Sequence, residues 1–441
     1  MDSQVMDLVG VGIGPTNLSL AALLERIPEV RSRFFEQRET FNWHPGMMLS
    51  NTRMQTSFLK DLVTPVDPTS PYSFLAYLVA KGRFFRFLNA DFSRVRRIEF
   101  ADYMRWTASQ LENLSFGCAV EQVRFDGRDF VVSVAGSRAA TRARNLVLAI
   151  GLERHIPTWA EPYLGPAVVH NHGYMGSAIN VEGKRVAVIG GGQSGAEIFL
   201  DVMSGARGQP ADVAWLSRRP NLDPLDETSF TNEYFTPDYV RHFHKLNPQR
   251  RSLMVRAQKL AGDGVSPETL RELSQLLYEC DFLAPRPWQH RILTHRDVRS
   301  VRRERGVFQL NMRNGFTRSD ESLPVDMLIL ATGYRYKLPA FLDTVAPGIE
   351  RDVDGSVKLN EDYSINWDGP RTHRIFMQNA GRNSHGIADP QLSLAAWRAG
   401  VIVNSMLGRE VYPTEPSPPP LRWTGTGLAA SSSPGFDEAE L

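Results

Sequence analysis

The chain contains only two cysteines in 441 residues, Cys118 and Cys280. They lie far apart and belong to no CxxC or CxxxxC pair, which excludes a disulfide framework, a cysteine-rich zinc site and the paired redox cysteines of a disulfide reductase. No apolar run reaches the roughly 18 residues that a membrane-spanning helix needs, and we expect no signal peptide before the first strand. These absences favour a soluble, cytoplasmic protein without stable membrane insertion.

An excess of charge of either sign is also missing, because 50 lysines and arginines stand against 49 aspartates and glutamates. No charge field therefore points to nucleic acid or a membrane surface as a partner. Apolar residues make up 42% of the chain, which is enough to fill sizeable cores. At about 150 residues per domain, the length predicts two or three domains.

The chain does contain two glycine-rich loops, each directly after an apolar strand. The first is Gly10-Val-Gly12-Ile-Gly14-Pro-Thr-Asn17, and an apolar helix follows it. A turn without β-carbons lets a pyrophosphate approach the backbone N–H groups at a helix N-terminus. Glu36 ends the next strand, where a carboxylate binds ribose hydroxyls, and it suits the unphosphorylated ribose of FAD. Asn17 replaces the third glycine of the motif, so a tight turn without a nucleotide is the alternative.

The second loop is Gly190-Gly191-Gly192-Gln193-Ser194-Gly195, and it matches the dinucleotide pattern fully. The next strand ends in Ser217-Arg218-Arg219 instead of an acidic residue. Guanidinium groups bind a 2′-phosphate through charge-assisted, often bidentate hydrogen bonds. The second nucleotide is therefore predicted to be NADPH, with a solvated surface pair of arginines as the alternative.

These features predict an α/β fold with two Rossmann-like dinucleotide-binding domains, the second inserted into the first, and a small, mostly helical substrate region. Ser266 and Pro267 predict the start of a helix in that region. Apolar strands at 145–150 and 326–334 are expected to return the chain to the first domain. The expected divisions are 1–160 for the first part of the FAD domain, 161–325 for the NADPH domain with a helical insertion around 221–300, 326–410 for the FAD-domain return with substrate-site residues, and 411–441 for a disordered tail rich in Pro and Ser.

Several local strings resemble the flavin-dependent N-hydroxylating monooxygenases of siderophore biosynthesis, and the resemblance covers nearly the whole chain to about residue 425. It is most similar to the branch of lysine N6-hydroxylases and diamine N-hydroxylases. The strings are the GxGPxN loop at Gly12–Asn17, Trp43-His44-Pro45-Gly46-Met47, Met54-Gln55-Thr56, Phe58-Leu59-Lys60-Asp61-Leu62, the loop at Gly190–Ser194, Asn232-Glu233-Tyr234-Phe235, Ala331-Thr332-Gly333-Tyr334, His385-Gly386-Ile387 and Leu392-Ser393-Leu394.

The resemblance implies a reaction in which NADPH reduces FAD and the reduced flavin captures O2. The resulting flavin hydroperoxide transfers one oxygen atom to an unprotonated primary amine, without a metal. The cofactor supplies the chemistry, and the protein must place the amine and exclude water. The implied substrate is L-lysine or a short diamine such as cadaverine or putrescine, in the service of hydroxamate siderophore synthesis. The family also implies a homo-oligomer, commonly a tetramer.

The resemblance also assigns roles to individual residues. Gln55 matches a glutamine beside the flavin ring, Lys60 a lysine that contacts the substrate's amino-acid end, Asn232 an asparagine near substrate and nicotinamide, and Ser393 a substrate-contacting hydroxyl. Gln193 and Ser194 resemble residues that line the NADPH pyrophosphate. The remaining residues assigned to cofactor binding are Trp43, His44, Thr332, Gly333 and Leu392.

Each assignment has a plainer alternative. Lys60 would be an exposed cation paired with Asp61, and Asn232 and Ser393 would be capping or loop residues. His44 and His385 lie among Pro and Gly neighbours, which favours turn histidines over general bases, so we predict no catalytic histidine.

Other activities remain open on the sequence. Ornithine hydroxylases carry an asparagine–tyrosine pair where this chain has Asp263-Gly264, which favours lysine or a diamine over ornithine. A monooxygenase of the Baeyer–Villiger or sulfur-oxidising kind is disfavoured, because its Phe, Gly, His and Trp fingerprint lacks the proper spacing here. A nucleotide-sensing protein without turnover is the non-enzymatic alternative.

Overall fold

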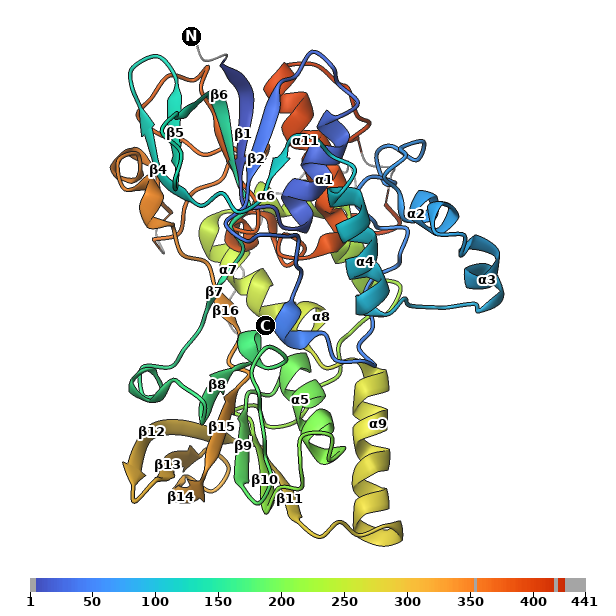
Figure 1. Ribbon diagram of the computed structural model, residues 1–441, viewed down its shortest axis with the longest axis vertical. Helices are drawn as coiled ribbons and strands as arrows, with labels where there is room; N and C mark the ends of the chain where they lie inside the picture. Colours follow the sequence, from blue (N-terminus) through green and yellow to red (C-terminus); the bar gives the residue numbers. More distant parts are fainter. Residues whose placement is uncertain (1–4, 353–354, 416–418, 425–441) are drawn as a thin grey trace, which may run out of the picture.

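The computed structural model describes residues 5–352, 355–415 and 419–424. Two separate sheets organise the chain, one in the upper half of Figure 1 and one in the lower half. Buried apolar side chains form one core around the first sheet, and further clusters lie on the two faces of the second. Within the described ranges, no helix has the length and apolar character needed to cross a bilayer.

The first sheet has the strand order β3-β2-β1-β6-β5-β4, and β17 also pairs with β6. Strands β1, β2, β3, β6 and β17 are parallel, whereas β4 and β5 extend the sheet in antiparallel fashion. The strands are β1 (Met6–Val11), β2 (Ser32–Phe35), β3 (Leu114–Ser115), β4 (Val120–Phe125), β5 (Phe130–Val134), β6 (Thr141–Leu148) and β17 (Ile375–Met377).

Helix α1 (Pro15–Leu24) begins directly after the first glycine loop, and every residue from Thr16 to its end is buried. A helix that is apolar on all sides must be covered on all sides. Helix α11 (Ala395–Leu407) and helix α4 (Arg97–Ala108) pack against it (Figure 1). Helices α2 (Phe74–Ala80) and α3 (Phe84–Asn89) project from the side of this domain.

The second sheet has the parallel order β11-β10-β9-β15-β8. Helix α5 (Gln193–Met203) follows the second glycine loop and packs on β9 and β10. An antiparallel sheet of β12, β13 and β14 covers the other face. The strands are β8 (Val168–His170), β9 (Arg185–Ile189), β10 (Asp212–Leu216), β11 (Gln289–Leu293), β12 (Arg296–Glu304), β13 (Val307–Asn314), β14 (Ser319–Val325) and β15 (Met327–Leu330).

A helical region lies between β10 and β11, as predicted, but it is shorter than the expected 221–300. It runs from about 231 to 283, because β11 and the start of β12 already belong to sheets. Ser266 caps helix α9 by accepting a hydrogen bond from the Thr269 N–H, with Pro267 in the first turn, which confirms that helix start. The elements are η4 (Thr231–Phe235), α6 (Pro237–His244), α7 (Pro248–Ala257), α8 (Lys259–Asp263), α9 (Pro267–Tyr278) and the π-helical turn η5 (Glu279–Leu283).

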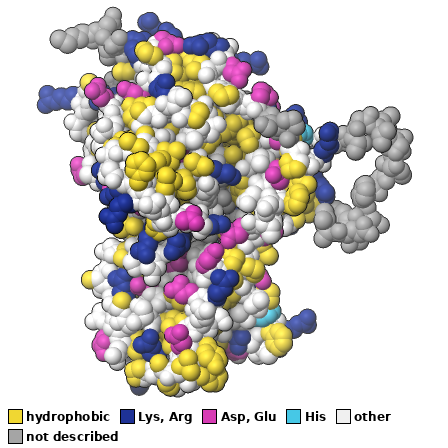
Figure 2. Space-filling view, turned by 90° about the vertical axis from the view of Figure 1, so that its right-hand side faces the viewer, with side chains coloured by type: hydrophobic (Ala, Val, Ile, Leu, Met, Phe, Trp, Pro, Cys, Tyr) yellow, Lys and Arg dark blue, Asp and Glu magenta, His cyan; other side chains and the backbone are white. Residues whose placement is uncertain are grey.

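The return to the first domain comes later than predicted. Strand β15 pairs with β9 and β8, so residues 327–330 belong to the second sheet, and the first sheet is regained only at β17. The predicted strand at 145–150 does lie in the first sheet, as β6. Two linker segments, β7 (Glu153–Arg154) and β16 (Tyr334–Arg335), pair in antiparallel fashion between the domains. Figure 2 shows that the surface narrows at this junction, with basic and acidic side chains along it.

The segment 411–415 is not the start of a disordered tail. Tyr412 and Thr414 are buried. The Tyr412 hydroxyl donates to the Leu23 carbonyl at 2.6 Å, and the Trp397 Nε1–H donates to the Thr414 carbonyl at 2.9 Å. The predicted tail was thus too long at its beginning, while its parts at 416–418 and 425–441 lie outside the described residues.

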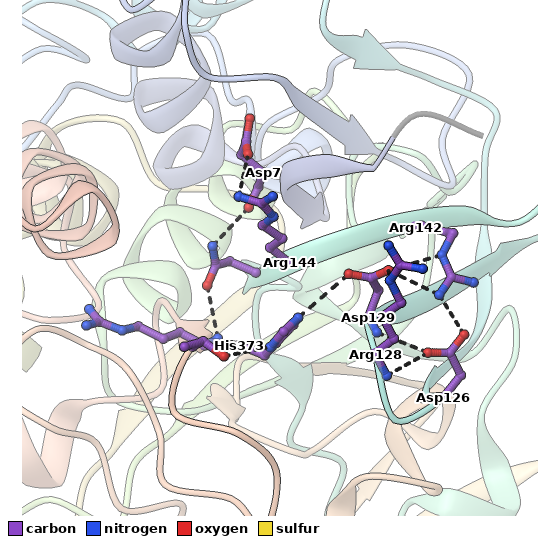
Figure 3. A network of polar contacts seen from close by, with 10 residues as sticks. Asp7, Asp126, Arg128, Asp129, Arg142, Arg144 and His373 are labelled. Carbon is purple, nitrogen blue, oxygen red and sulfur yellow. Dashed lines mark hydrogen bonds and ion pairs between the residues drawn. The ribbon is translucent and has the colours of Figure 1, made fainter. Parts of the chain in front are cut away.

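A polar network holds the outer edge of the first sheet. The Arg142 guanidinium lies between Asp126 and Asp129, at 2.7 and 3.1 Å (Figure 3). His373, from the segment before β17, approaches Asp129 at 3.7 Å, and Arg144 approaches Asp7 at 3.9 Å. The Arg142 contacts fasten the β4–β5 turn to β6, His373 links that turn to the segment before β17, and Arg144 links β6 to β1. We assign these contacts to the scaffold.

Candidate active site

The first glycine loop packs closely on its neighbours and stays open on one side. A β-carbon on Gly10 would lie 2.0 Å from the Phe34 ring, and one on Gly12, whose φ is +85°, would lie 2.5 Å from the Ala149 carbonyl. A β-carbon on Gly14 would meet nothing closer than 3.9 Å. The open side lies at the start of α1, where first-turn N–H groups lack partners within the helix. This arrangement fits a pyrophosphate.

Asn17 holds this loop from behind. It is fully buried, its Nδ2 donates to the Gly12 carbonyl at 2.8 Å, and its Oδ1 accepts from Gln378 Nε2 at 2.8 Å. Its side chain therefore shapes the loop, and a contact of Asn17 with the cofactor stays a prediction. Gln378 was missed in the sequence, although its place at the carboxyl end of parallel β17 is a usual position for site residues.

Glu36 lies at the rim of the same loop. Its carboxylate accepts from the Ile13 N–H at 2.9 Å and from the Arg38 N–H at 3.1 Å. The structure thus brings the carboxylate to the glycine loop, as the spacing predicted. Its contact with a ribose stays a prediction.

The segment after Glu36 joins the two domains. A β-carbon on Gly46 would lie 1.9 Å from the His172 carbonyl, so the two backbones touch here. His44 has a left-handed backbone with φ of 44°, and its ring lies 5.0 Å from Trp43. The His44 imidazole reaches solvent but is surrounded by protein at the junction, and this poor solvation, with Arg97 nearby, lowers its pKa to about 4. Such a histidine is neutral near pH 7.

Lys60 and Asp61 face different environments. The Asp61 carboxylate is buried and accepts backbone N–H groups of Val63, Thr64 and Phe74 at 2.9, 2.7 and 2.7 Å. Burial raises the pKa of Asp61, and these hydrogen bonds oppose the shift. Asp61 therefore braces the loop and is not the partner of Lys60.

Lys60 is half-buried, and its charged neighbour comes from another part of the chain. Burial lowers its pKa, and the Glu233 carboxylate opposes this effect. Glu233 lies on η4 beside Asn232, which is exposed and whose Nδ2 donates to the Glu227 carbonyl at 3.5 Å. The structure thus brings the Lys60 loop and the Asn232 turn together. Gln55 is exposed on the same loop as Lys60, and its place beside a flavin ring stays a prediction.

Ser393 is buried on η8 (Leu392–Leu394), next to the half-buried Leu392. Its Oγ has no hydrogen-bond partner among the described residues, and the same holds for the buried Tyr336 hydroxyl. Buried hydroxyls are normally bonded, so an orphaned one indicates a missing ligand or water. This observation fits the expectation that Ser393 contacts a bound molecule.

A buried ion pair that the sequence did not reveal lies close by. Asp389 and Arg398 are 3.4 Å apart, and both side chains are fully buried. Burial raises the pKa of Asp389, and the Arg398 guanidinium opposes the shift. In the sequence, the one indication of this ion pair was Arg398 within the mostly apolar helix α11. The buried His385 stacks on Tyr363 at 4.1 Å, and burial holds its pKa well below the usual value, which makes it a neutral core residue.

The second glycine loop repeats the design of the first. A β-carbon on Gly190 would lie 2.1 Å from the Ala331 carbonyl, and one on Gly195 would lie 2.0 Å from the Gly190 carbonyl. Gly192 is open, with the Asp263 carboxylate as the nearest group at 3.9 Å. Ser194 is half-buried in the first turn of α5. Loop and helix start fit a second pyrophosphate.

The side chain of Gln193 does not face this open side. Its Oε1 accepts from the Ser266 N–H at 2.7 Å, and its Nε2 donates to Thr269 Oγ1 at 3.0 Å and to Glu197 Oε1 at 2.8 Å. Gln193 thus ties α5 to the start of α9. The predicted contact of Gln193 with the NADPH pyrophosphate stays a prediction.

The two arginines after β10 are not equivalent. Arg219 donates from Nη1 to the Asp263 carbonyl at 2.7 Å and pairs through Nη2 with the Asp263 carboxylate at 2.9 Å. Arg218 is exposed and makes no ion pair with the described residues. Both lie at the end of β10, where the ribose phosphate of NADPH is expected.

Thr332 and Gly333 lie in the linker between the domains. The Thr332 hydroxyl donates to the His155 carbonyl at 2.5 Å, and the His155 N–H donates to the Gly333 carbonyl at 2.9 Å. Gly333 has φ of +84°. Their contacts are those of a structural hinge, and a flavin contact stays a prediction.

Two dinucleotide loops on two linked sheets define an NADPH-dependent flavoprotein oxidoreductase. The family model described as L-lysine 6-monooxygenase/L-ornithine 5-monooxygenase matches residues 4–336. The chain belongs to this family of flavin-dependent N-hydroxylating monooxygenases, which use FAD and NADPH.

Several known proteins are similar to this chain over most of their length. The L-lysine N6-monooxygenase of Escherichia coli is 39% identical over 95% of this chain and 98% of its own. The putrescine N-hydroxylase of Shewanella oneidensis is 33% identical over 94% of this chain and 83% of its own. Among solved structures, the FAD-bound cadaverine monooxygenase DfoA of Erwinia amylovora has a TM-score of 0.89 and 31% identity, covering 98% of this chain and 100% of its own. The ornithine N-hydroxylase KtzI of Kutzneria has a TM-score of 0.83 and 30% identity, covering 92% and 99%.

Proposed function

We propose that this protein hydroxylates the side-chain nitrogen of L-lysine, as an N6-monooxygenase that feeds hydroxamate siderophore synthesis. The observation that carries the proposal is the half-buried Lys60 with Glu233 as its charged neighbour. A zwitterionic amino-acid head group complements such a pair, because its carboxylate fits the lysine and its ammonium fits the glutamate. A diamine brings a second cation toward Lys60 and lacks the carboxylate. The 39% identity to the Escherichia coli lysine enzyme supports the same choice.

The proposal gives each group of the site a task. Bound FAD, once reduced by NADPH, supplies the activation of oxygen. Lys60 binds the substrate carboxylate, and Asn232 offers its amide to the substrate amine without fixing a charge. Ser393 Oγ, which lacks a partner among the described residues, donates to or accepts from the bound substrate. Gln55 would lie beside the bound flavin ring, where it would limit the access of water.

A substrate panel tests the proposal. Purified holoenzyme with NADPH is offered L-lysine, L-ornithine, cadaverine, putrescine and 1,3-diaminopropane, and the hydroxylamine product is quantified because NADPH loss alone includes uncoupled oxidation. We expect kcat/KM for L-lysine to exceed that for cadaverine by about tenfold or more, since one charge-assisted hydrogen bond is worth roughly 1.5–3 kcal/mol. A higher value for a diamine would reassign the substrate.

A Lys60→Met variant separates carboxylate binding from scaffolding. We expect it to raise KM for L-lysine about tenfold or more while flavin reduction by NADPH stays near the wild-type rate. Lys81→Met, at an exposed lysine after α2, is the matched control. Equal loss of both steps would make Lys60 a scaffold residue.

A cytoplasmic homo-tetramer, as the family resemblance implies, is part of the same proposal. Analytical ultracentrifugation of the holoenzyme tests the assembly, and a monomer in solution would contradict the proposed tetramer.

A further inference from the structure

The Arg97–Glu197 ion pair joins a helix of the FAD domain to the helix that follows the NADPH loop. Arg97, the first residue of α4 in the FAD domain, donates from Nη1 to Glu197 Oε2 at 3.0 Å and from Nη2 to Glu197 Oε1 at 2.9 Å. Glu197 lies on α5, the helix that follows the NADPH loop. The side chains are only 16% and 7% exposed. Such a fork-to-fork pair is directional, and at this depth it is weakly screened by salt.

The pair is extended at both ends. Arg97 also donates from Nε to the Arg53 carbonyl at 3.2 Å and from its backbone N–H to the Thr52 carbonyl at 2.9 Å. These carbonyls belong to the loop that continues into Gln55 and Lys60. On the other side, Gln193 Nε2 donates to Glu197 Oε1. A continuous set of hydrogen bonds therefore connects the loop at 52–60 in the FAD domain with Gln193, at the end of the second glycine loop.

The position of the pair complements that of the covalent linkers. The chain passes between the domains through the ribbon of β7 and β16. In Figure 1, α4 and α5 lie on the other side of the junction from this ribbon. A ribbon on one side allows rotation about itself, and an ion pair on the far side opposes that rotation. The charge of Glu197 is also neutralised, so that it does not repel a pyrophosphate at the start of its own helix.

We propose that Arg97 and Glu197 are positioning residues that fix the NADPH domain against the FAD domain. In this role they set the distance and angle at which the nicotinamide meets the flavin, without contact to either cofactor. Hydride transfer depends steeply on such geometry, since a misplacement of about 1 Å can cost about a hundredfold in rate. Loss of the pair therefore slows flavin reduction while each domain still binds its own nucleotide.

The test compares binding with reduction in Arg97→Met, which keeps the apolar stem and removes the charged fork. We expect wild-type FAD content, a Kd for 2′,5′-ADP within about twofold of wild type by calorimetry, and a rapid-reaction rate of flavin reduction at saturating NADPH at least about tenfold lower. Amide hydrogen exchange in residues 48–61 should rise, because the Arg53 carbonyl loses its partner. Arg97→Lys, which keeps the charge but not the fork, should recover part of the rate.

A second ion pair provides the control. Arg296 pairs with Glu321 at 3.0 and 3.1 Å, also in bidentate fashion, but both residues lie in the sheet of β12, β13 and β14. Arg296→Met removes a bidentate pair within one domain and should leave the reduction rate within about twofold.

Three outcomes would overturn the proposal. The first is a wild-type reduction rate in Arg97→Met. The second is a loss of FAD or 2′,5′-ADP binding in proportion to the loss of rate, which would show a role in folding or binding. If Arg97→Met does not fold, Arg97→Lys and Glu197→Gln replace it in the test. The third outcome is then a wild-type reduction rate in both of these variants. None of these outcomes depends on whether lysine is the substrate.

Discussion

Lys60 and Asp61 are adjacent in the sequence, but the Lys60 ammonium has Glu233 as its charged neighbour, whereas the Asp61 carboxylate closes a buried turn. The same division separates Arg218 from Arg219. Arg219 is bound by Asp263, 44 residues further along the chain, whereas Arg218 is exposed. A sequence motif states which residue types are present at a turn. It does not state which of these side chains binds a residue from a distant part of the chain. A side chain that is already bound in this way is less available to a ligand than one that is not.

Arg218 is therefore expected to be the main contact of the 2′-phosphate. Arg218→Ala should weaken binding of 2′,5′-ADP by about tenfold to a hundredfold, since a hydrogen bond to a charged group is worth roughly 1.5–3 kcal/mol. Binding of 5′-ADP, which lacks that phosphate, should stay unchanged. Calorimetry on the FAD-loaded protein measures both, with Arg302→Ala at an exposed position of β12 as control. Equal weakening of the two nucleotides would contradict the assignment.

The strand, loop and helix units were predictable because each depends on residues close in sequence. Glycine loops after β1 and β9 and the cap of α9 follow from local chemistry. The sheet to which β15 belongs does not follow from local chemistry. Its four residues, Met-Leu-Ile-Leu, are buried on both faces, and such a strand fits any parallel sheet. Its pairing with β9 is set by the geometry of the surrounding helices and linkers, which a short apolar run does not encode.

Strand β8 ends in a histidine that makes the fold sensitive to acid. Buried His170 accepts from the His172 N–H through Nδ1 at 3.2 Å, and its Nε2 lies 3.2 Å from the Gly333 carbonyl. Burial lowers its pKa to about 4, although the Gly333 carbonyl opposes the shift. The folded state thus binds fewer protons than the unfolded state between pH 6.5 and 4. The stability is complete above pH 6.5 and falls as the pH decreases toward 4.

We expect His170 to cost about 2 kcal/mol of stability between pH 7.5 and pH 5, because each pH unit below 6.5 costs about 1.4 kcal/mol. Urea unfolding at the two pH values measures this change. His170→Gln keeps a donor for the Gly333 carbonyl and has no proton to gain, so its pH dependence should be correspondingly smaller. An unchanged pH dependence would place the acid sensitivity elsewhere, for example at His44.

The C-terminal segment connects parts of the chain that are nearly 400 residues apart. Tyr412 bonds to Leu23 in the first helix, and Val411 and Tyr412 donate to Asn404 in the last. The segment was predicted to be disordered from its Pro and Ser content. Most of the Pro and Ser residues behind this prediction follow residue 415 in the sequence, whereas the buried Tyr412 ring fixes the segment 411–415.

Truncation after Glu410 should lower the thermal unfolding midpoint by several degrees, because loss of a buried aromatic side chain costs about 3–5 kcal/mol. Tyr412→Phe in the full chain keeps the ring and loses one hydrogen bond, so its effect should be smaller. Differential scanning calorimetry of the holoenzymes compares the two. A truncated protein as stable as the full chain would show that the packing of Tyr412 is unimportant.

The pairing of β7 with β16 also bears on how the protein could be rebuilt, because the chain leaves the first domain and returns to it at neighbouring points. An exchanged nicotinamide domain would need this pair of strands, but also an acidic partner for Arg97 and a backbone that fits against Gly46. The helical region between β10 and β11 would have to stay, because Phe235, Val240 and Ala261 belong to the core of the first sheet.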